Sequence, residues 1–91
     1  MRSRYSAYAV LDDEYLRHSW HPSTRPRRIA LDPELAWVEL EIVAVDGGGP
    51  FDQEGTVEFR AHHQRDGRPG VLHEVSRFTR VDRRWVYLDA V

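Results

Sequence analysis

The chain has 91 residues, a formal net charge of −2 at neutral pH and no Cys. This length gives one domain with a single core, and a hydrophobic content of 41%, with three Trp, four Tyr and three Phe, excludes a disordered chain. The lack of Cys excludes disulfides, a thiol nucleophile and thiolate metal sites, and the slightly acidic balance argues against nucleic acid as a partner.

The N-terminal part of the chain has the spacing of helices. Tyr5 and Tyr8 fall on one stripe of a helix over residues 2–11. Asp12 can cap a second segment that continues to Trp20. The pattern fits one bent helix and two separate helices equally well.

Prolines shape the connection that follows. A residue before a proline favours extended geometry, so Pro22 ends the helical path and residues 22–28 are expected to form a stiff, Arg-rich loop. Asp32-Pro33-Glu34 is a helix-start signal, with Asp as cap and Pro at the first position, and it predicts a helix of one or two turns.

From Trp37 the hydrophobic period changes to two, which predicts strands over 37–45, 56–64, 71–80 and 84–90. Glycine-rich or polar turns separate them, at 46–50, 66–70 and 81–83. Short connections predict an antiparallel meander, and helices followed by strands predict an α+β fold with the helices on one sheet face. Strict alternation in the first strand places Trp37 on the face opposite Val38, Leu40, Ile42 and Ala44.

Several segments, in order along nearly the whole chain, match one bacterial family. They are residues 1–8 and 20–24, Trp37, and residues 57–61, 73–78 and 85–89. These segments resemble the middle domain of the YchJ-like family of uncharacterised bacterial proteins. The resemblance implies a nuclear-transport-factor-like cone, in which a curved four-stranded antiparallel sheet packs its concave face on the N-terminal helices. The whole chain, residues 1–91, is expected to be one such domain.

One departure from the family is large. Its members commonly carry Cys-rich SEC-C segments, expected to bind zinc, whereas this chain has no Cys and begins where the middle domain begins. The chain is then a minimal member, or the flanking segment lies outside it. The zinc role is not transferred, and no cofactor is expected.

Many proteins with this fold use the interior of the cone as a small-molecule pocket, and several are dehydratases, isomerases or cyclases. The resemblance therefore implies a pocket, and its candidate lining residues are Tyr5, Tyr8, Trp20, His21, Trp37 and Arg77. The candidate catalytic residues are His21, Tyr5 and Glu74. Each has a structural alternative, which we favour for His21 and for the tyrosines.

His21 stands at the helix-to-loop corner, where an imidazole can act as general acid or base. Its structural alternative is a cap on the carbonyls of the preceding helix, or a side chain in water. Tyr5 and Tyr8 lie one helical turn apart and can orient a carbonyl or stabilise an oxyanion. Their alternative is a place as half-buried core aromatics.

Charged residues alternate along two of the predicted strands. Glu58, Arg60 and His62 share one strand face, and a hairpin turn at 66–67 brings Arg60 opposite or near Glu74. If this row faces the cone, the pKa of each glutamate rises and the glutamates become candidate bases. If it faces outward, it is a ladder of weak cross-strand pairs or a pairing surface.

Other polar clusters give weaker indications of a functional site. His62 and His63 point to opposite sheet faces, so only one of them can join His73 in a metal site, and we expect no metal. The glycines at 47–49 open no helix and predict a hairpin tip rather than a phosphate cradle. The arginines at 25–28 are expected to form a solvated turn.

We expect a non-catalytic binding or assembly domain, with a homodimer through the sheet as one arrangement. The alternative is a pocket for an unknown small molecule with acid/base catalysis of the dehydratase or isomerase type. A cavity of ~300 Å³ or more favours that alternative, whereas a cone filled by Trp20, Trp37, Phe78 and Trp85 counts against it. No apolar run approaches the ~20 residues of a membrane span or resembles a signal peptide, so we expect a cytoplasmic protein.

Overall fold

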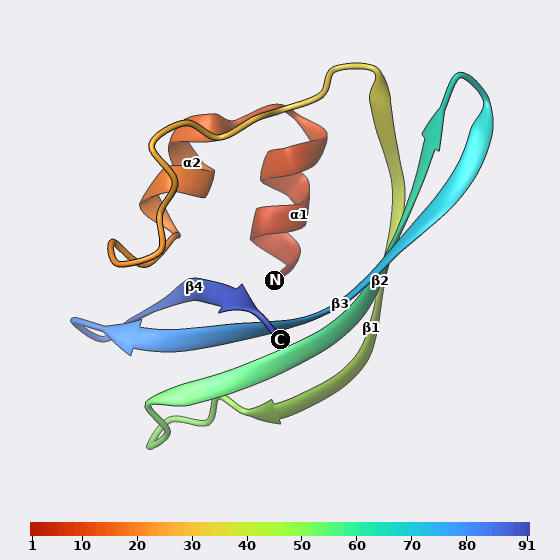
Figure 1. Cartoon of the computed structure of the whole chain (residues 1–91). Helices are drawn as coiled ribbons and strands as arrows, with labels where there is room; N and C mark the ends of the chain where they lie inside the picture. Colours follow the sequence, from red (N-terminus) through yellow and green to blue (C-terminus); the bar gives the residue numbers. More distant parts are fainter.

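The computed structural model describes all residues from 1 to 91 and consists of two short helices followed by one curved sheet (Figure 1). The helices are α1 (Arg2–Ala9) and α2 (Asp13–His18), and the strands are β1 (Leu35–Gly47), β2 (Glu54–Arg65), β3 (Arg68–Val81) and β4 (Arg84–Ala90). The strands lie in the order β1-β2-β3-β4, and all neighbours are antiparallel. The predicted α+β meander is confirmed. Neither helix has the length and apolar character needed to cross a lipid bilayer.

The N-terminal segment forms two helices rather than one bent helix. The chain turns sharply at Leu11, which has a left-handed backbone with φ of 59°. The Asp12 carboxylate then accepts a hydrogen bond of 3.0 Å from the amide of Tyr15 and caps α2. The predicted capping role of Asp12 is confirmed.

The helix predicted at Asp32-Pro33-Glu34 does not form. The Asp32 side chain accepts a hydrogen bond of 3.0 Å from the Glu34 amide, and its carbonyl accepts one of 3.2 Å from the amide of Leu35. Arg65, at the end of β2, pairs with the carboxylates of both Asp32 and Glu34. The prediction is wrong because β1 begins at Leu35, so the capping side chain closes a single turn instead of opening a helix.

Two bulges in β1 change which of its side chains face the helices. The pairing with β2 shifts register between Trp37 and Glu39 and again between Ile42 and Ala44, which leaves Val38 and Val43 as extra residues. Trp37 consequently joins the concave face, where Ile42 lies opposite the buried Phe59. The predicted separation of Trp37 from Leu40 and Ile42 is therefore wrong.

The sheet curves around the helices, which lie in its concavity as predicted (Figure 1). The residues that are almost wholly buried come from both layers and include Ala7, Leu16, Phe59, Ala61 and Val86. The segment after α2 is tied to the edge strand β4. The amide of His21 donates a hydrogen bond of 2.7 Å to the carbonyl of Tyr87, and the Tyr87 amide donates one of 2.8 Å to the carbonyl of Ser19.

Candidate functional site

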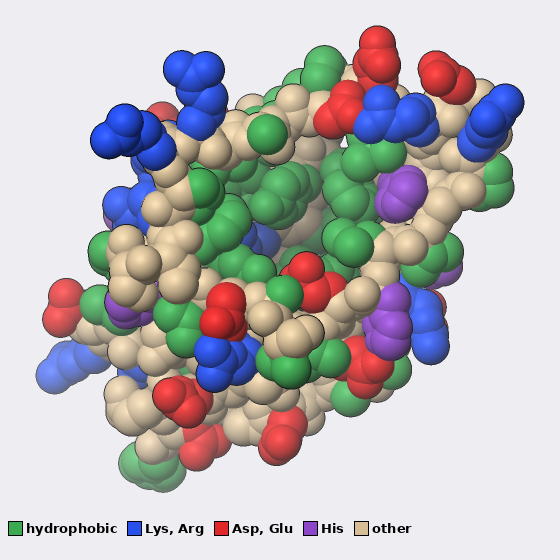
Figure 2. All heavy atoms as spheres, viewed as in Figure 1, with side chains coloured by type: hydrophobic (Ala, Val, Ile, Leu, Met, Phe, Trp, Pro, Cys, Tyr) green, Lys and Arg blue, Asp and Glu red, His purple; other side chains and the backbone are tan.

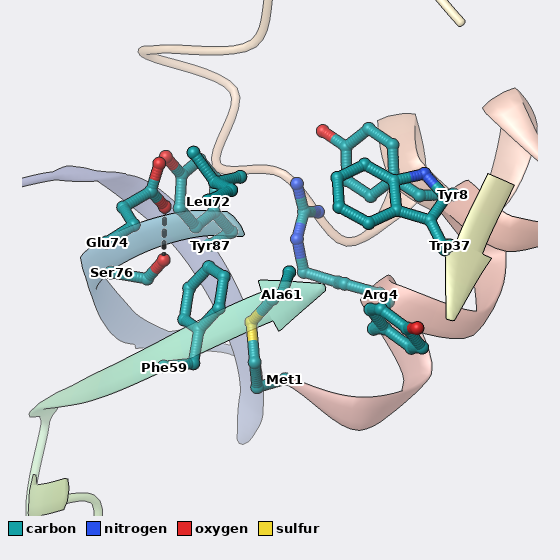
Figure 3. Close-up of a pocket in the computed structure, with 11 residues that line it drawn as sticks. Met1, Arg4, Tyr8, Trp37, Phe59, Ala61, Leu72, Glu74, Ser76 and Tyr87 are labelled. Atoms are coloured by element: carbon teal, nitrogen blue, oxygen red, sulfur yellow. Dashed lines mark hydrogen bonds between the residues drawn. The ribbon is translucent and has the colours of Figure 1, made fainter. Parts of the chain in front are cut away.

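A cavity of about 190 Å³ lies between α1 and the concave face of the sheet (Figure 3). Figure 2 shows the corresponding hollow, edged with hydrophobic side chains, between the helices and the sheet. Eight of the eleven lining residues are hydrophobic, so the walls are mainly apolar with a few polar groups. The lining consists of Met1, Arg4, Tyr5, Tyr8, Trp37, Phe59, Ala61, Leu72, Glu74, Ser76 and Tyr87.

Arg4 brings a buried positive charge to this cavity from α1. The side chain is 4% exposed, and its Nη1 atom donates hydrogen bonds to the carbonyl of Leu16 at 3.2 Å and to Oγ of Ser19 at 2.7 Å. The guanidinium carbon lies 4.9 Å from the ring centre of Trp20 and 4.5 Å from that of Tyr87. Burial lowers the pKa of Arg4 from its usual value. None of the ion pairs in the structure involves Arg4.

Glu74 brings a negative charge to the same cavity from β3. The half-buried carboxylate accepts a hydrogen bond of 2.6 Å from Oγ of Ser76, which is itself fully buried. Across the sheet, Glu74 lies opposite Phe59 on β2, whose ring also lines the cavity. Like Arg4, Glu74 has no partner of opposite charge.

Tyrosine side chains and the α-amino group of Met1 supply further polar groups around the cavity. Burial, together with the negative charge of Glu74, raises the pKa of Tyr87 to about 12. Burial also raises the pKa of Tyr5, with a smaller contribution from Glu39, and the Tyr5 hydroxyl is buried without a hydrogen-bond partner. Both phenols therefore stay protonated at neutral pH and act as hydrogen-bonding groups rather than as bases.

Four of the residues that the sequence analysis proposed for the pocket lie together in the structure. Tyr5, Tyr8, Trp37 and Glu74 all line the cavity. The rings of Tyr5 and Tyr8 lie 5.9 Å and 6.3 Å from the Trp37 ring and form one aromatic wall with it.

Three other proposed residues lie outside the cavity lining. Trp20 packs behind Arg4, with its ring centre 5.0 Å from that of Tyr87. The Nδ1 atom of His21 accepts a hydrogen bond of 3.0 Å from the amide of Ser23, so the ring caps the turn that follows rather than the helix before it. Arg77 forms two hydrogen bonds of 2.6 Å with the carboxylate of Asp89, which raise the pKa of Arg77 and lower that of Asp89.

Arg4, Ser76 and Tyr87 are site residues that the sequence reasoning missed. A signal for Arg4 was present, because it stands four positions before Tyr8 and so shares its helix face. An arginine on an aromatic stripe indicates a guanidinium that packs against rings. Ser76 and Tyr87 carried no comparable signal, since their places depend on how the sheet curves.

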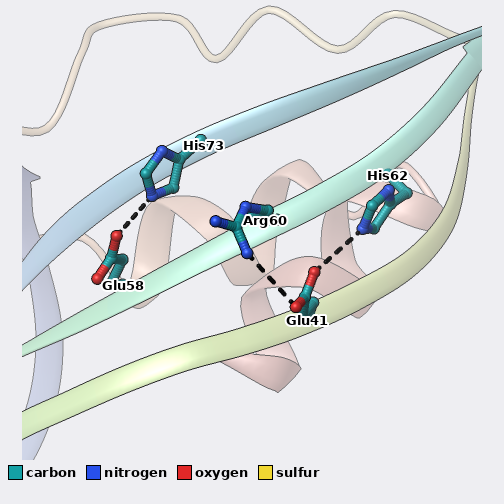
Figure 4. A network of polar contacts seen from close by, with 5 residues as sticks. All are labelled: Glu41, Glu58, Arg60, His62 and His73. Carbon is teal, nitrogen blue, oxygen red and sulfur yellow. Dashed lines mark hydrogen bonds and ion pairs between the residues drawn. The ribbon is translucent and has the colours of Figure 1, made fainter.

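The predicted charged row lies on the convex face of the sheet, but without Glu74 (Figure 4). Arg60 and His62 both reach Glu41 of β1, at 3.5 Å and 3.4 Å, and Glu58 lies 2.6 Å from His73. Arg60 pairs in register with His73, so its neighbour Glu74 points to the concave side. The row is therefore a set of exposed pairs, and the expectation that Glu74 belongs to it is wrong.

The histidines divide between the two faces of the sheet. His63 packs against Trp37 on the concave side, with the ring centres 5.4 Å apart, whereas His62 pairs with Glu41 on the convex side. Nowhere in the chain do three His, Asp or Glu side chains gather as a metal ion would require.

Comparisons with known proteins agree with this geometry. The model of the YchJ middle NTF2-like domain matches residues 1–90. A UPF0225 protein of Streptomyces coelicolor is 52% identical over 89 residues, which cover 98% of this chain and 68% of the relative. A UPF0225 protein of Corynebacterium efficiens is 47% identical over 87 residues, which cover 96% of this chain and 66% of the relative. The chain thus spans about two thirds of the length of these relatives.

Two solved structures share the fold. The solution structure of RPA3114, a SEC-C motif containing protein from Rhodopseudomonas palustris, has a TM-score of 0.84 at 31% identity and matches 100% of this chain and 73% of its own. The crystal structure of a SEC-C motif containing protein from Psychrobacter arcticus has a TM-score of 0.76 at 27% identity and matches 98% of this chain and 56% of its own. From its sequence and its curved sheet alike, this chain belongs to the YchJ family, with the fold of that family's middle, NTF2-like domain.

Proposed function

We propose that this chain is a non-catalytic ligand-binding domain, which holds a small molecule in the cavity between α1 and the concave face of the sheet. The lining carries the proposal, because its walls are mainly apolar while Arg4 and Glu74 place on them two charged side chains that form no ion pair. A ligand covers the apolar walls and offers partners to these polar groups.

The size of the cavity limits the ligand. Of the four aromatic residues expected to fill the cone, only Trp37 lines the cavity, so the space stays open. Its volume is about 190 Å³. Pockets for drug-sized ligands measure ~300–1,000 Å³. The proposed ligand is therefore a small metabolite rather than a nucleotide or cofactor.

Acid/base catalysis has less support. No histidine lines the cavity, and the ring of His21 is engaged by Ser23 outside it. A phenol with a pKa of about 12, as in Tyr87, is no base at neutral pH. Glu74 is left without a second acid or base beside it, so binding without chemistry is the function that the lining supports best.

Assembly through the sheet stays a prediction. On the convex face, the side chains of Arg60, His62 and His73 already contact glutamates of the same chain, which leaves few polar groups for a second copy. Sedimentation velocity distinguishes the monomer from the homodimer directly.

The experiment that tests the proposed function is a fragment screen by amide and indole NMR shifts, with two matched variants on β3. Leu72 is 42% exposed at the cavity, and Val71 is 53% exposed on the opposite face of the same strand. Leu72→Trp is expected to fill the cavity and abolish ligand-induced shifts, whereas Val71→Trp leaves them unchanged. A ligand whose shifts survive in Leu72→Trp, or a screen in which no fragment shifts the lining residues, would overturn the proposal.

A further inference from the structure

The cavity holds two opposite charges that the protein itself does not pair. Arg4 and Glu74 are the only charged side chains among its eleven lining residues, and neither takes part in an ion pair. They enter from opposite layers, Arg4 from α1 and Glu74 from β3 (Figure 3). The guanidinium carbon of Arg4 lies 4.5 Å from the ring centre of Tyr87, and the charge of Glu74 contributes to the raised pKa of the Tyr87 hydroxyl.

This arrangement is unusual, because a charge removed from water is normally paired where it is buried. Arg4 is 4% exposed, and its hydrogen bonds to Leu16 and Ser19 go to neutral oxygens and involve only Nη1. Glu74 accepts one hydrogen bond, from the neutral hydroxyl of Ser76. Each charge is thus held in place by neutral partners and keeps its attraction for a counter-charge in the cavity.

Resting on the proposed function, we infer that the ligand is a small zwitterion of the amino-acid class, whose carboxylate faces Arg4 and whose ammonium faces Glu74. The two side-chain charges sum to zero, so a neutral molecule with separated charges satisfies both of them. The third ionisable group of the lining is the α-amino group of Met1, whose pKa is lowered by burial and by the charge of Arg4. A simple carboxylate leaves Glu74 unpaired, and a simple amine leaves Arg4 unpaired. The aromatic wall of Tyr5, Tyr8 and Trp37 receives the apolar body of the molecule.

The volume is consistent with this class. About 190 Å³ is enough for a single small amino acid. A charge-assisted hydrogen bond contributes ~1.5–3 kcal/mol, which corresponds to a tenfold to hundredfold change in affinity. The ammonium is therefore expected to make a difference that a titration measures readily.

The test uses two zwitterions with different charge spacing, each beside its deaminated form. L-Leucine is compared with 4-methylpentanoate, and 6-aminohexanoate with hexanoate, by NMR titration of the full chain. We expect at least one zwitterion to bind tenfold or more tightly than its deaminated form. If each carboxylate binds as well as its zwitterion, or if neither zwitterion binds, the inference is overturned.

A substitution at Glu74 separates charge recognition from folding. Glu74→Gln keeps the shape and an acceptor for Ser76, so it is expected to remove the preference for the zwitterion while the carboxylate still binds. Glu58→Gln makes the same change on the convex face of the sheet and is expected to leave both affinities unchanged. A preference that survives in Glu74→Gln contradicts the inference.

Failure of the inference is distinguishable from failure of the proposed function. If no amino acid binds but another fragment does, with binding abolished by Leu72→Trp and kept in Val71→Trp, the domain is a binding module for a different class of molecule. If no probe of any class perturbs the cavity, both conclusions fall.

Discussion

Nη1 of Arg4 donates a hydrogen bond of 2.7 Å to Oγ of Ser19, which joins the first helix to the residue just after the second. The same nitrogen reaches the carbonyl of Leu16, the most deeply buried apolar residue of the chain. The guanidinium lies close to the rings of Trp20 and Tyr87. One arginine thus connects both helices, the loop after them and β4, and it holds a charge beside the cavity.

Removal of this guanidinium is expected to destabilise the fold. Arg4→Met keeps much of the aliphatic stem but leaves the Ser19 hydroxyl without its donor and the Leu16 carbonyl with the Ser19 hydroxyl alone, at a cost of ~2–4 kcal/mol in the free energy of unfolding. Arg2→Met changes an exposed arginine in the same helix and is expected to cost less than ~0.5 kcal/mol. Urea denaturation measures both, and equal costs would refute the role assigned to Arg4.

His21 is expected to act on stability and not on ligand binding. His21→Ala removes the acceptor for the Ser23 amide and is expected to lower the melting temperature by ~4–8 °C, which corresponds to ~1 kcal/mol for a domain of this size. His21→Asn keeps an acceptor near the same place and is expected to recover part of the loss. If His21→Ala instead abolishes ligand-induced NMR shifts while the melting temperature stays the same, His21 belongs to the site after all.

The two faces of β2 are expected to respond very differently to truncation. Arg60→Ala breaks an exposed pair with Glu41 and is expected to cost less than ~1 kcal/mol. Phe59→Ala, one position earlier, removes a ring that is 3% exposed on the concave face and is expected to cost ~3–5 kcal/mol. Comparable losses of unfolding free energy for the two variants in denaturant titrations would mean that the side chains of β2 are assigned to the wrong faces of the sheet.

Tyr87 predicts a loss of stability in alkali. Its pKa is about 12 in the folded protein and near 10 when unfolded, so between these values the unfolded chain releases the proton first. The stability that Tyr87 contributes is therefore fully present below pH 10, is lost as the pH rises from 10 to about 12, and does not fall further beyond that. Tyr87→Phe is expected to flatten this decline in denaturant titrations from pH 9 to 11, and an unchanged slope would contradict the burial of the phenol.

Features of the fold that depend on neighbouring residues could be predicted from the sequence, whereas features that depend on the pairing of strands could not. The hairpin turn at Asp66 and Gly67 was predictable, because this dipeptide favours the positive φ values of 52° and 74° found there. The face of Trp37 was not, since the bulge at Val38 arises from the register with β2 and leaves no period in the sequence. Asp32 shows an intermediate case, in which the local cap forms but the following strand sets the outcome.

The candidate site divides in the same way. The sequence was enough to propose three lining residues, Tyr5, Tyr8 and Trp37, because aromatic residues at helical or strand spacing can be recognised in the sequence alone. Glu74 was proposed as a base, but its side of the sheet depends on the register of β2 with β3, which a shift of one residue reverses. The placement of Arg4 and Glu74 around one cavity brings together α1 and β3, which are far apart in the chain, so no spacing in the sequence indicates it.

The most direct test of the account is to locate a bound ligand by intermolecular nuclear Overhauser effects in the full chain. For the tighter zwitterion, we expect contacts from its apolar protons to the rings of Tyr8 and Trp37, with its ammonium end nearest Glu74. Contacts confined to the convex face around Arg60 and His73, or to the loop at His21, would contradict it.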